Sequence, residues 1–318
     1  MATATSDVTQ AVHRVPPAPG KAAAGRTPRR RKNLTPWAFL SPTVLLMLVL
    51  MLVPIVMVIV YSLKNNVIMT RKSEIIGLGN YGEILTDPIF LKALMNTVIF
   101  TVTSVVAHLV LGLTFAMMLN SPLLSNATRA VFRVIYFLPW LFTVAVIAVL
   151  WRLILSPNGV LNYILQQWGL ISEKVEWLSS PSTALIAVTF INIWAGYPFY
   201  MVSLLAGLQG IPRDLYEAAR VDGATARQQF FNVTIPQLRP IIISMAMLDV
   251  IWTSQQFALI WMTTGGGPGT STEMLSTYTY KLAFSEYEFS LASTSAVIVF
   301  LLSMVLAFWY ARHQKARD

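Results

Sequence analysis

The stretch WAFLSPTVLLMLVLMLVPIVMVIVYSL, residues 37–63, decides the fold class of this chain. It contains no charged side chain, and it exceeds the roughly 20 helical residues that a hydrocarbon core about 30 Å thick requires. A cleavable signal peptide has an apolar core of only about 7–15 residues followed by a small-residue cleavage site, and this stretch has neither. We therefore expect it to remain in the membrane as a helix.

Further segments along the chain have the same length and apolar character. The whole composition agrees with a membrane protein, because 55% of the residues are hydrophobic and only 12% are charged, with a mean hydropathy of +0.61. We predict an all-α polytopic membrane protein with six transmembrane helices. The predicted spans are 37–63, 93–119, 133–155, 182–208, 240–262 and 290–311.

The positions of the basic residues predict the orientation. Most of the 23 Lys and Arg residues lie on the side of the spans that carries both chain ends, and loops rich in Lys and Arg stay in the cytoplasm. We expect a disordered basic tail at 1–35, a six-helix permease domain at 36–312 and a cytoplasmic C-terminal tail at 313–318. The net charge of +9 then faces lipid headgroups, and no nucleic-acid partner is expected.

Two predicted external segments carry turn residues and an amphipathic pattern. Gly77, Gly79 and Pro88 punctuate residues 64–92, and Pro157 to Gly159 open residues 156–180. We expect each segment to form a short helix on the outer surface.

Several kinds of chemistry are excluded. The chain has no cysteine, and its three histidines are scattered, so neither a disulfide nor a metal site is expected. GKAAAGRT at 20–27 resembles a phosphate-binding loop, but Arg replaces the essential Lys and no strand precedes it. GLGNYG at 77–82 has dinucleotide-site spacing, but it lies in a loop between spans. We predict no catalytic residue and no cofactor in this chain, so energy from ATP would have to come from a partner.

The longest predicted cytoplasmic loop contains IPRDLYEAARVDG, residues 211–223. Pro212 suits a first helical position, Arg213 and Glu217 are four residues apart, and Gly223 suits a helix C-terminus. The pattern predicts a short helix, a turn and a second short helix. One interpretation is an amphipathic connector on lipid headgroups; the other is a docking surface, because small side chains let another protein approach closely.

This loop resembles a family motif. Glu-Ala-Ala, three residues, Gly, nine residues, and then aliphatic-x-aliphatic-Pro ending at Pro236 is similar to the EAA motif of binding-protein-dependent ABC importer permeases. The resemblance implies that segment 211–236 inserts into a cleft on an ATP-binding subunit and transmits its closure. The residues that it implies for coupling to the ATPase subunit are Glu217, Ala218, Ala219, Asp222 and Gly223.

Other stretches resemble carbohydrate permeases of the maltose and glycerol-phosphate type. They are GLGNY at 77–81, NT at 96–97, NIWAGYPF at 192–199 and TGGGP at 264–268, and the last resembles the first permease subunit of such pairs. The resemblance implies a bacterial inner-membrane protein that imports a sugar. It also implies a second permease subunit, two copies of an ATP-binding subunit that carries ATP and Mg²⁺, and an extracytoplasmic solute-binding protein.

Polar residues within two predicted spans suggest a substrate pathway. Asp249 is the only one of the 14 acidic residues inside a predicted span, and a carboxylate near the midplane costs roughly 2.5 to 3.5 kcal/mol unless it faces the bundle interior or water. These polar residues either line the pathway or hold helices together. The positions match those at which related maltose-type subunits contact sugar: Asn192, Gly196 and Phe199 in the fourth span, and Asp249, Thr253 and Gln256, with the same helical spacing, in the fifth.

His108 is a titratable residue inside a predicted span. We interpret His108, in the second predicted span, as a packed histidine bonded to a backbone carbonyl, in preference to a proton relay. Two rival functions are considered. One is a proton-coupled secondary sugar carrier in which Asp249 titrates, and the lack of evident inverted repeats disfavours it. The other is a membrane scaffold. The sequence does not distinguish a disaccharide, an oligosaccharide and a glycerol phosphodiester as the substrate.

Overall fold

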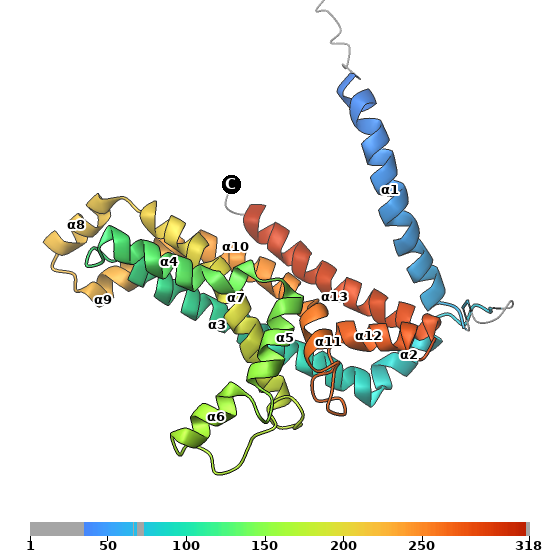
Figure 1. The fold of residues 1–318 in the computed structure, drawn as a ribbon. Coiled ribbons are helices and arrows are strands. Elements are labelled where there is room, and N and C mark those ends of the chain that lie inside the picture. The colour runs from blue at the N-terminus through green and yellow to red at the C-terminus, as the bar shows by residue number, and fades with distance from the viewer. Residues whose placement is uncertain (1–34, 66, 69–72, 316–318) are drawn as a thin grey trace, which may run out of the picture. The chain divides into compact units, whose positions relative to one another are not determined.

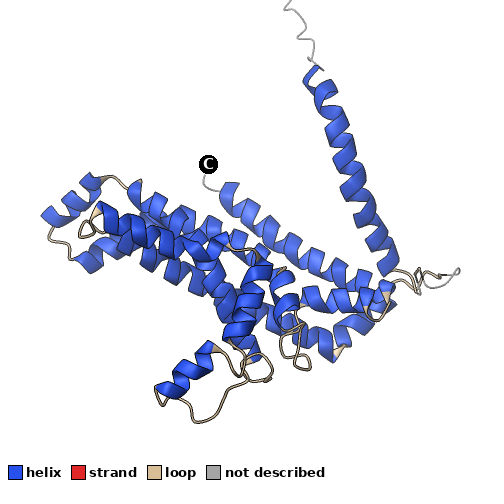
Figure 2. Cartoon of the chain, in the orientation of Figure 1, coloured by secondary structure: helices blue, strands red, loops and turns tan. Residues whose placement is uncertain are grey.

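A computed structural model describes residues 35–65, 67–68 and 73–315, and in these ranges the chain is almost entirely helical (Figure 2). Within them no named strand forms, and one isolated bridge pairs Lys64 with Ile75. The predicted all-α fold is confirmed. The helices are α1 (Thr35–Ser62), α2 (Gly79–Thr86), α3 (Pro88–Asn120), α4 (Asn126–Leu141), α5 (Val144–Ile154), α6 (Val160–Gln167), α7 (Ala184–Gln209), α8 (Arg213–Val221), α9 (Ala226–Gln229), the π-helix η1 (Phe230–Thr234), α10 (Ile235–Ser254), α11 (Ala258–Thr263), α12 (Leu275–Phe284) and α13 (Phe289–Lys315).

The chain divides after Leu52 into two units. The described part of the first unit is the uncharged beginning of α1, and the second unit holds all the other helices. Residues 1–34, which make up nearly all of the predicted basic tail and include GKAAAGRT, lie outside the described residues. At the other end α13 continues through Lys315, so the predicted C-terminal tail begins as helix.

Several helical stretches are long and apolar enough to cross a membrane. The described chain has 5 such stretches, or up to 6 if the bent pair α4 and α5 counts as one crossing. The predicted number of spans agrees with the higher count. The single stretches are Phe39–Ser62, Pro88–Asn120, Ala184–Gln209, Ala226–Ser254 and Phe289–Arg312.

The predicted span at 133–155 is not one continuous helix. The chain there forms α4 and α5, which are bent by 99° relative to each other. Pro139 lies in the last turn of α4, where its ring removes a backbone donor and crowds the preceding turn. The Thr143 hydroxyl accepts a hydrogen bond from the backbone N–H of Val146 at 3.4 Å, which caps a new helix.

The fifth span is also displaced from its predicted bounds of 240–262. Helical backbone runs without interruption from Ala226 through η1 to Ser254 and then stops. The hydroxyl of Ser276 donates to the backbone carbonyl of Gln256 at 2.8 Å, so a contact from α12 satisfies an acceptor just beyond the helix end. The apolar residues of α11 continue the hydrophobic pattern but belong to a separate helix.

Both predicted external segments contain the expected short helices, α2 and α6. The membrane helix that follows α2 begins earlier than predicted, at Pro88. The Asp87 carboxylate accepts from the backbone N–H of Ile89 at 2.8 Å and caps this helix, while Pro88 occupies its first turn.

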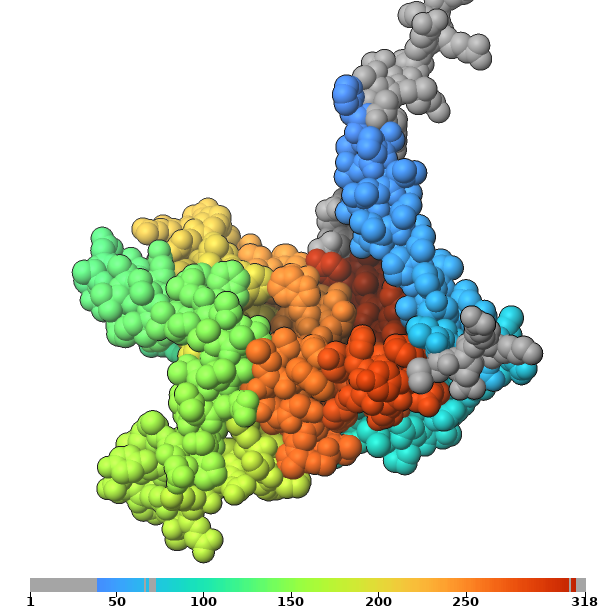
Figure 3. Space-filling view, turned by 45° about the vertical axis from the view of Figure 1, so that its right-hand side comes forward, coloured from blue at the N-terminus to red at the C-terminus, as the bar shows by residue number. Residues whose placement is uncertain are grey.

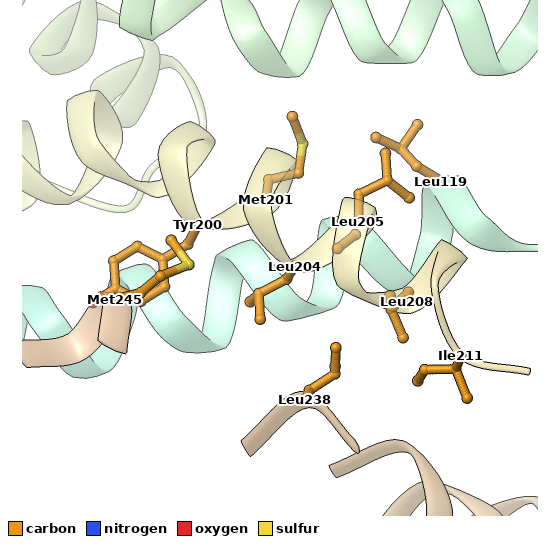
Figure 4. Close-up of a cluster of buried hydrophobic side chains, with 10 residues drawn as sticks. Leu119, Tyr200, Met201, Leu204, Leu205, Leu208, Ile211, Leu238 and Met245 are labelled. Atoms are coloured by element: carbon orange, nitrogen blue, oxygen red, sulfur yellow. The ribbon is translucent and has the colours of Figure 1, made fainter. Parts of the chain in front are cut away.

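The main hydrophobic core lies where α3, α7 and α10 meet. Leu119, Leu204 and Leu238 contribute one buried side chain from each helix (Figure 4). Gly112 lets α3 approach α7 closely, because a Cβ there would lie 2.4 Å from the Cβ of Tyr200 and 3.0 Å from the backbone nitrogen of Met201. This close packing fixes the geometry of the polar residues that lie along the same helices.

Candidate functional site: a polar cluster and an exposed helix

A polar cluster joins the three central helices. Nδ1 of His108 on α3 lies 2.8 Å from Oδ2 of Asp249 on α10, and the Thr253 hydroxyl donates to Oδ1 of Asp249 at 2.7 Å. On the other side of the ring, His108 Nε2 lies 3.1 Å from the backbone carbonyl of Asn192 on α7. All four residues are buried, so Asp249 makes its contacts within the protein.

The hydrogen bonds of His108 fix the net charge of its pair with Asp249. The carbonyl of Asn192 can only accept, so Nε2 carries a proton. One further proton lies between Nδ1 and the carboxyl group, which gives either imidazolium with carboxylate or imidazole with carboxylic acid. Both forms are neutral overall, which lowers the cost of placing Asp249 inside a membrane span.

Gly196 provides the space for the His108 ring. A Cβ on Gly196 would lie 2.4 Å from Nε2 and 2.6 Å from Cε1 of His108. Four of the six predicted pathway residues therefore come together: Asn192, Gly196, Asp249 and Thr253. Their arrangement matches the alternative interpretation, in which polar residues hold helices together, while the amide nitrogen of Asn192 is buried without a hydrogen-bond partner among the described residues.

The other two predicted residues lie outside this cluster. Phe199 packs between Trp140 on α4 and Trp252 on α10, with ring-centroid distances of 6.3 and 6.0 Å. Both indoles are more than half exposed, so an open aromatic surface surrounds Phe199. The prediction that Gln256 continues the helical stripe of Asp249 is wrong, because α10 ends at Ser254.

His108 is the residue that the sequence prediction left out. Its predicted bond to a backbone carbonyl is confirmed by the contact with Asn192, but its pairing with Asp249 was not foreseen. The signal was present, since a lone carboxylate inside a span needs a partner. His108 was a titratable side chain available within another predicted span.

The predicted cytoplasmic helix is α8. None of its residues is buried, and Glu217 and Ala218 are exposed while Ala219 is half-buried. Pro212 lies just before the helix instead of in its first turn. Asp222 follows the last helical residue, and Gly223 has a φ of +77°, so the predicted glycine stop is confirmed.

A cavity of about 690 Å³ lies beside α8. Arg213, Glu217 and Arg220 line it from α8, and Asn120 and Pro122 line it from the turn between α3 and α4. Figure 1 shows α8 and α9 at the end of the bundle where α4 begins. The predicted second short helix is α9, with a capping box between Thr225 and Gln228, but it continues directly through η1 into α10.

At the opposite end, the glycine-rich stretch after α11 folds over the ion pair that the partly exposed Lys281 makes with the buried Glu273. Gly266 has a φ of +90°, and a Cβ there would lie 2.3 Å from Oε2 of Glu273, so a residue with a side chain would be strained at this position. The amide nitrogen of Asn96 lies within hydrogen-bond distance of three carbonyls of this segment, including that of Glu273 at 3.0 Å. Two stretches that carried the family resemblance, 96–97 and 264–268, thus belong to one local structure.

The glycine-rich stretch after α11 is exposed beside α5 and the residues before α7. A cavity of about 380 Å³ is lined by Arg152, Glu176 and Thr264, among others, and Figure 3 shows the orange segment after α11 beside yellow-green residues of the α6–α7 connection. Nearby, the phenol of Tyr278 donates to Asp87 at 2.5 Å. Burial, followed by the hydrogen bond and charge of Asp87, raises the pKa of Tyr278, so this phenol stays protonated.

Comparison with protein families gives a match over residues 84–317 to the family described as "Binding-protein-dependent transport system inner membrane component". The chain belongs to this family. It is therefore an inner-membrane permease subunit of a binding-protein-dependent ABC importer and not an enzyme, since its relatives are permease subunits.

Curated relatives cover nearly the same length. The chain is 35% identical over 292 residues to the lactose transport system permease protein LacF of Rhizobium radiobacter, covering 90% of this chain and 97% of that protein. It is 33% identical over 280 residues to the trehalose/maltose transport system permease protein MalF of Thermococcus litoralis, covering 87% and 92%.

A solved structure shares the fold. A chain from the crystal structure of a bacterial alginate ABC transporter in complex with an alginate pentasaccharide-bound periplasmic protein aligns with a TM-score of 0.75 at 24% identity. The alignment covers 87% of this chain and 92% of that chain. The likeness supports the all-helical permease fold found here.

Proposed function

We propose that this chain forms the translocation path of an ATP-driven sugar importer and receives the motion of an ATP-binding subunit through α8. The observation that carries the proposal is the exposed helix α8 with the 690 Å³ cavity beside it. This helix precedes the continuous helix Ala226–Ser254, and the far half of that helix bears Asp249. Glu217, Ala218, Ala219, Asp222 and Gly223 form the docking surface. ATP and Mg²⁺ act on the partner subunit.

The assembly contains a second permease subunit, two copies of the ATP-binding subunit and an external solute-binding protein. Both termini face the cytoplasm, which places α8 beside the ATP-binding subunits and the glycine-rich stretch after α11 on the outer face. The excess of Lys and Arg on the side of α8 supports this orientation. Membership of a binding-protein-dependent family supports the external partner and disfavours a proton-driven carrier.

The substrate is a sugar. The relatives named for lactose and for trehalose/maltose support this class. Aromatic and amide side chains would contact different parts of the sugar. The aromatic surface around Phe199 offers flat faces to a sugar ring, while the unpartnered amide of Asn192 and the side chain of Gln256 offer hydrogen bonds. Asp249 is neutralised by His108, so its contribution to the path is to position Asn192 and Thr253.

The docking surface is tested on the complex purified from the bacterium that carries the gene, through an affinity tag on this chain. We expect an ATP-binding polypeptide to copurify and its ATP hydrolysis to increase when the sugar-loaded binding protein is added. Glu217→Arg should remove the ATP-binding polypeptide, whereas Glu173→Arg, on an exposed external loop, should retain it. Equal capture by the two variants would contradict the assignment of α8.

The path is tested by uptake of sugar into vesicles that hold the assembled complex. Asn192→Leu and Gln256→Ala should lower uptake at unchanged assembly, and Gln255→Ala, one residue away at the exposed end of α10, is the matched control for Gln256. Uptake that needs no ATP and runs on a proton gradient would support the rival carrier. Uptake equal to that of the unsubstituted complex in both path variants would remove these residues from the path.

A further inference from the structure

A single side-chain hydrogen bond joins the exposed helix α8 to the membrane-spanning helix that follows it. The Tyr216 hydroxyl lies 2.9 Å from the hydroxyl of Thr234. Among the described residues, no other side-chain hydrogen bond from α8 reaches another helix. Tyr216 is half-buried and packs against the hydrophobic core, although no residue of α8 is fully buried.

Thr234 lies in an unusual segment. It is the last residue of η1, in which the backbone N–H of Ile235 donates to the carbonyl of Phe230, five residues back. Its hydroxyl is buried and lies 3.5 Å from the carbonyl of Gln229. Since that carbonyl can only accept, Thr234 donates to it, and Tyr216 then donates to Thr234.

The hydrogen bonds of a π-helical turn span five residues instead of the four of an α-helix, and such turns are frequent at functional sites. Here the turn separates α9, which follows α8 in the chain, from α10, which carries Asp249. Thr234 and Asp249 are 15 positions apart in the sequence, or roughly 22 Å along a helix. A displacement of α8 that reaches Thr234 therefore enters the same continuous helix that carries Asp249.

We propose that Tyr216 and Thr234 are positioning residues that transmit the movement of α8 to α10, with the π-helical turn η1 as the segment that responds. The inference rests on the proposed function, because it takes α8 to be the helix moved by an ATP-binding subunit. It goes further by naming the bond through which the movement enters the membrane bundle. Docking of the ATP-binding subunit uses other residues of α8.

The test measures movement of α10 in the purified complex by pulsed electron paramagnetic resonance. The chain has no cysteine, so Gln255→Cys, just beyond the end of α10, and Val110→Cys on α3 give one spin-label pair in this chain. The complex without these two substitutions, labelled in the same way, measures the background from the partner subunits. The distance is measured without nucleotide and with ATP, Mg²⁺ and vanadate. Capture of the ATP-binding polypeptide is measured on the same samples.

We expect the distance to change with nucleotide when both hydroxyls are present. Tyr216→Phe and Thr234→Val should each lower the ratio of moved to unmoved molecules about fivefold, the factor expected from the loss of one hydrogen bond. Thr234→Ser keeps a hydroxyl and should preserve the change. Tyr163→Phe, on the exposed surface of α6, is the matched control for loss of a phenol oxygen.

The outcomes separate this inference from the proposed function. If no ATP-binding polypeptide copurifies with the unsubstituted chain, the proposed function fails first. If it copurifies and α10 moves equally in Tyr216→Phe, Thr234→Val and the unsubstituted chain, the transmission route is overturned. Loss of the ATP-binding polypeptide from both variants would also overturn the route, because the bond would then serve assembly instead of movement. The route would likewise be overturned if nucleotide did not change the spin-label distance in the complex that carries both hydroxyls.

Discussion

Gly196 on α7 and His108 on α3 lie so close that a methyl group on Gly196 would overlap the imidazole ring, at 2.4 Å from Nε2. Glycine at 196 is therefore a condition for the pair of His108 and Asp249. Its substitution should disturb the polar cluster without adding or removing a polar group.

Gly196→Ala should lower stability by about 1–3 kcal/mol, the usual cost of overpacking a buried site. The measurement is the unfolding midpoint of the purified chain in one detergent. Gly82→Ala is the control, because Gly82 lies within α2 and a Cβ there meets nothing within 4 Å. Equal midpoints for the Gly196 variant and the unsubstituted chain would show that the ring of His108 can move aside.

His108 and Asp249 should be energetically coupled. Replacing His108 alone by Leu leaves Asp249 buried without its partner, which costs about 3–5 kcal/mol for a charged group. The double replacement by Leu removes both groups and should be less destabilised than the sum of the single replacements. A double-mutant cycle on unfolding free energies measures this coupling, and additive effects would contradict a direct pair.

The sequence could predict features that depend on local chemistry. Gly223 was identified as a helix stop because glycine adopts the left-handed conformation without strain, and its φ is +77°. The apolar spans were found because their length and lack of charge are set by the bilayer. Each of these features is read from neighbouring residues.

Features that depend on distant contacts were missed. Asp249 needed a partner, but His108 is 141 positions away, and no local pattern joins them. The helical spacing was continued to Gln256 because the apolar pattern continues into α11, whereas the break is stabilised by Ser276 from α12. The bend between α4 and α5 was missed because residues 134–151 form a predominantly apolar run of span length, in which Pro139 and Thr143 were not taken as a break.

Gly223→Ala should weaken docking of the ATP-binding subunit. A left-handed conformation costs a residue with a Cβ roughly 1–2 kcal/mol, and no atom lies within 4 Å of a Cβ at Gly223, so strain is the sole cost within the chain. The measurement is capture of the ATP-binding polypeptide.

Gly169→Ala is the matched control for this change. Gly169 has a φ of +67° with nothing within 4 Å of a Cβ, but it follows α6 on the predicted outer face. Gly169→Ala should show similar backbone strain, but capture of the ATP-binding polypeptide should be undiminished. Equal loss of capture in the two variants would indicate a general folding defect.

The ion pair beneath the glycine-rich stretch should dominate local stability. Glu273 is 1% exposed, so Lys281→Met leaves a buried carboxylate without its partner and should cost about 3–5 kcal/mol. Lys92→Met, at an exposed position of α3, is the control. Hydrogen exchange of residues 264–275 reports the local effect, and unchanged exchange in Lys281→Met would show that water replaces the lysine.

The 99° bend between α4 and α5 has a consequence for the surrounding lipid. Two helices at nearly a right angle cannot both stand upright in a bilayer, and hydrocarbon tails offer no hydrogen bonds to the backbone groups released at the corner. If the corner at Phe142 and Thr143 lies at the depth of the hydrocarbon core, its backbone groups need another polypeptide or water as hydrogen-bond partners. The corner then marks a stretch of the permease perimeter from which fatty acyl chains are kept away.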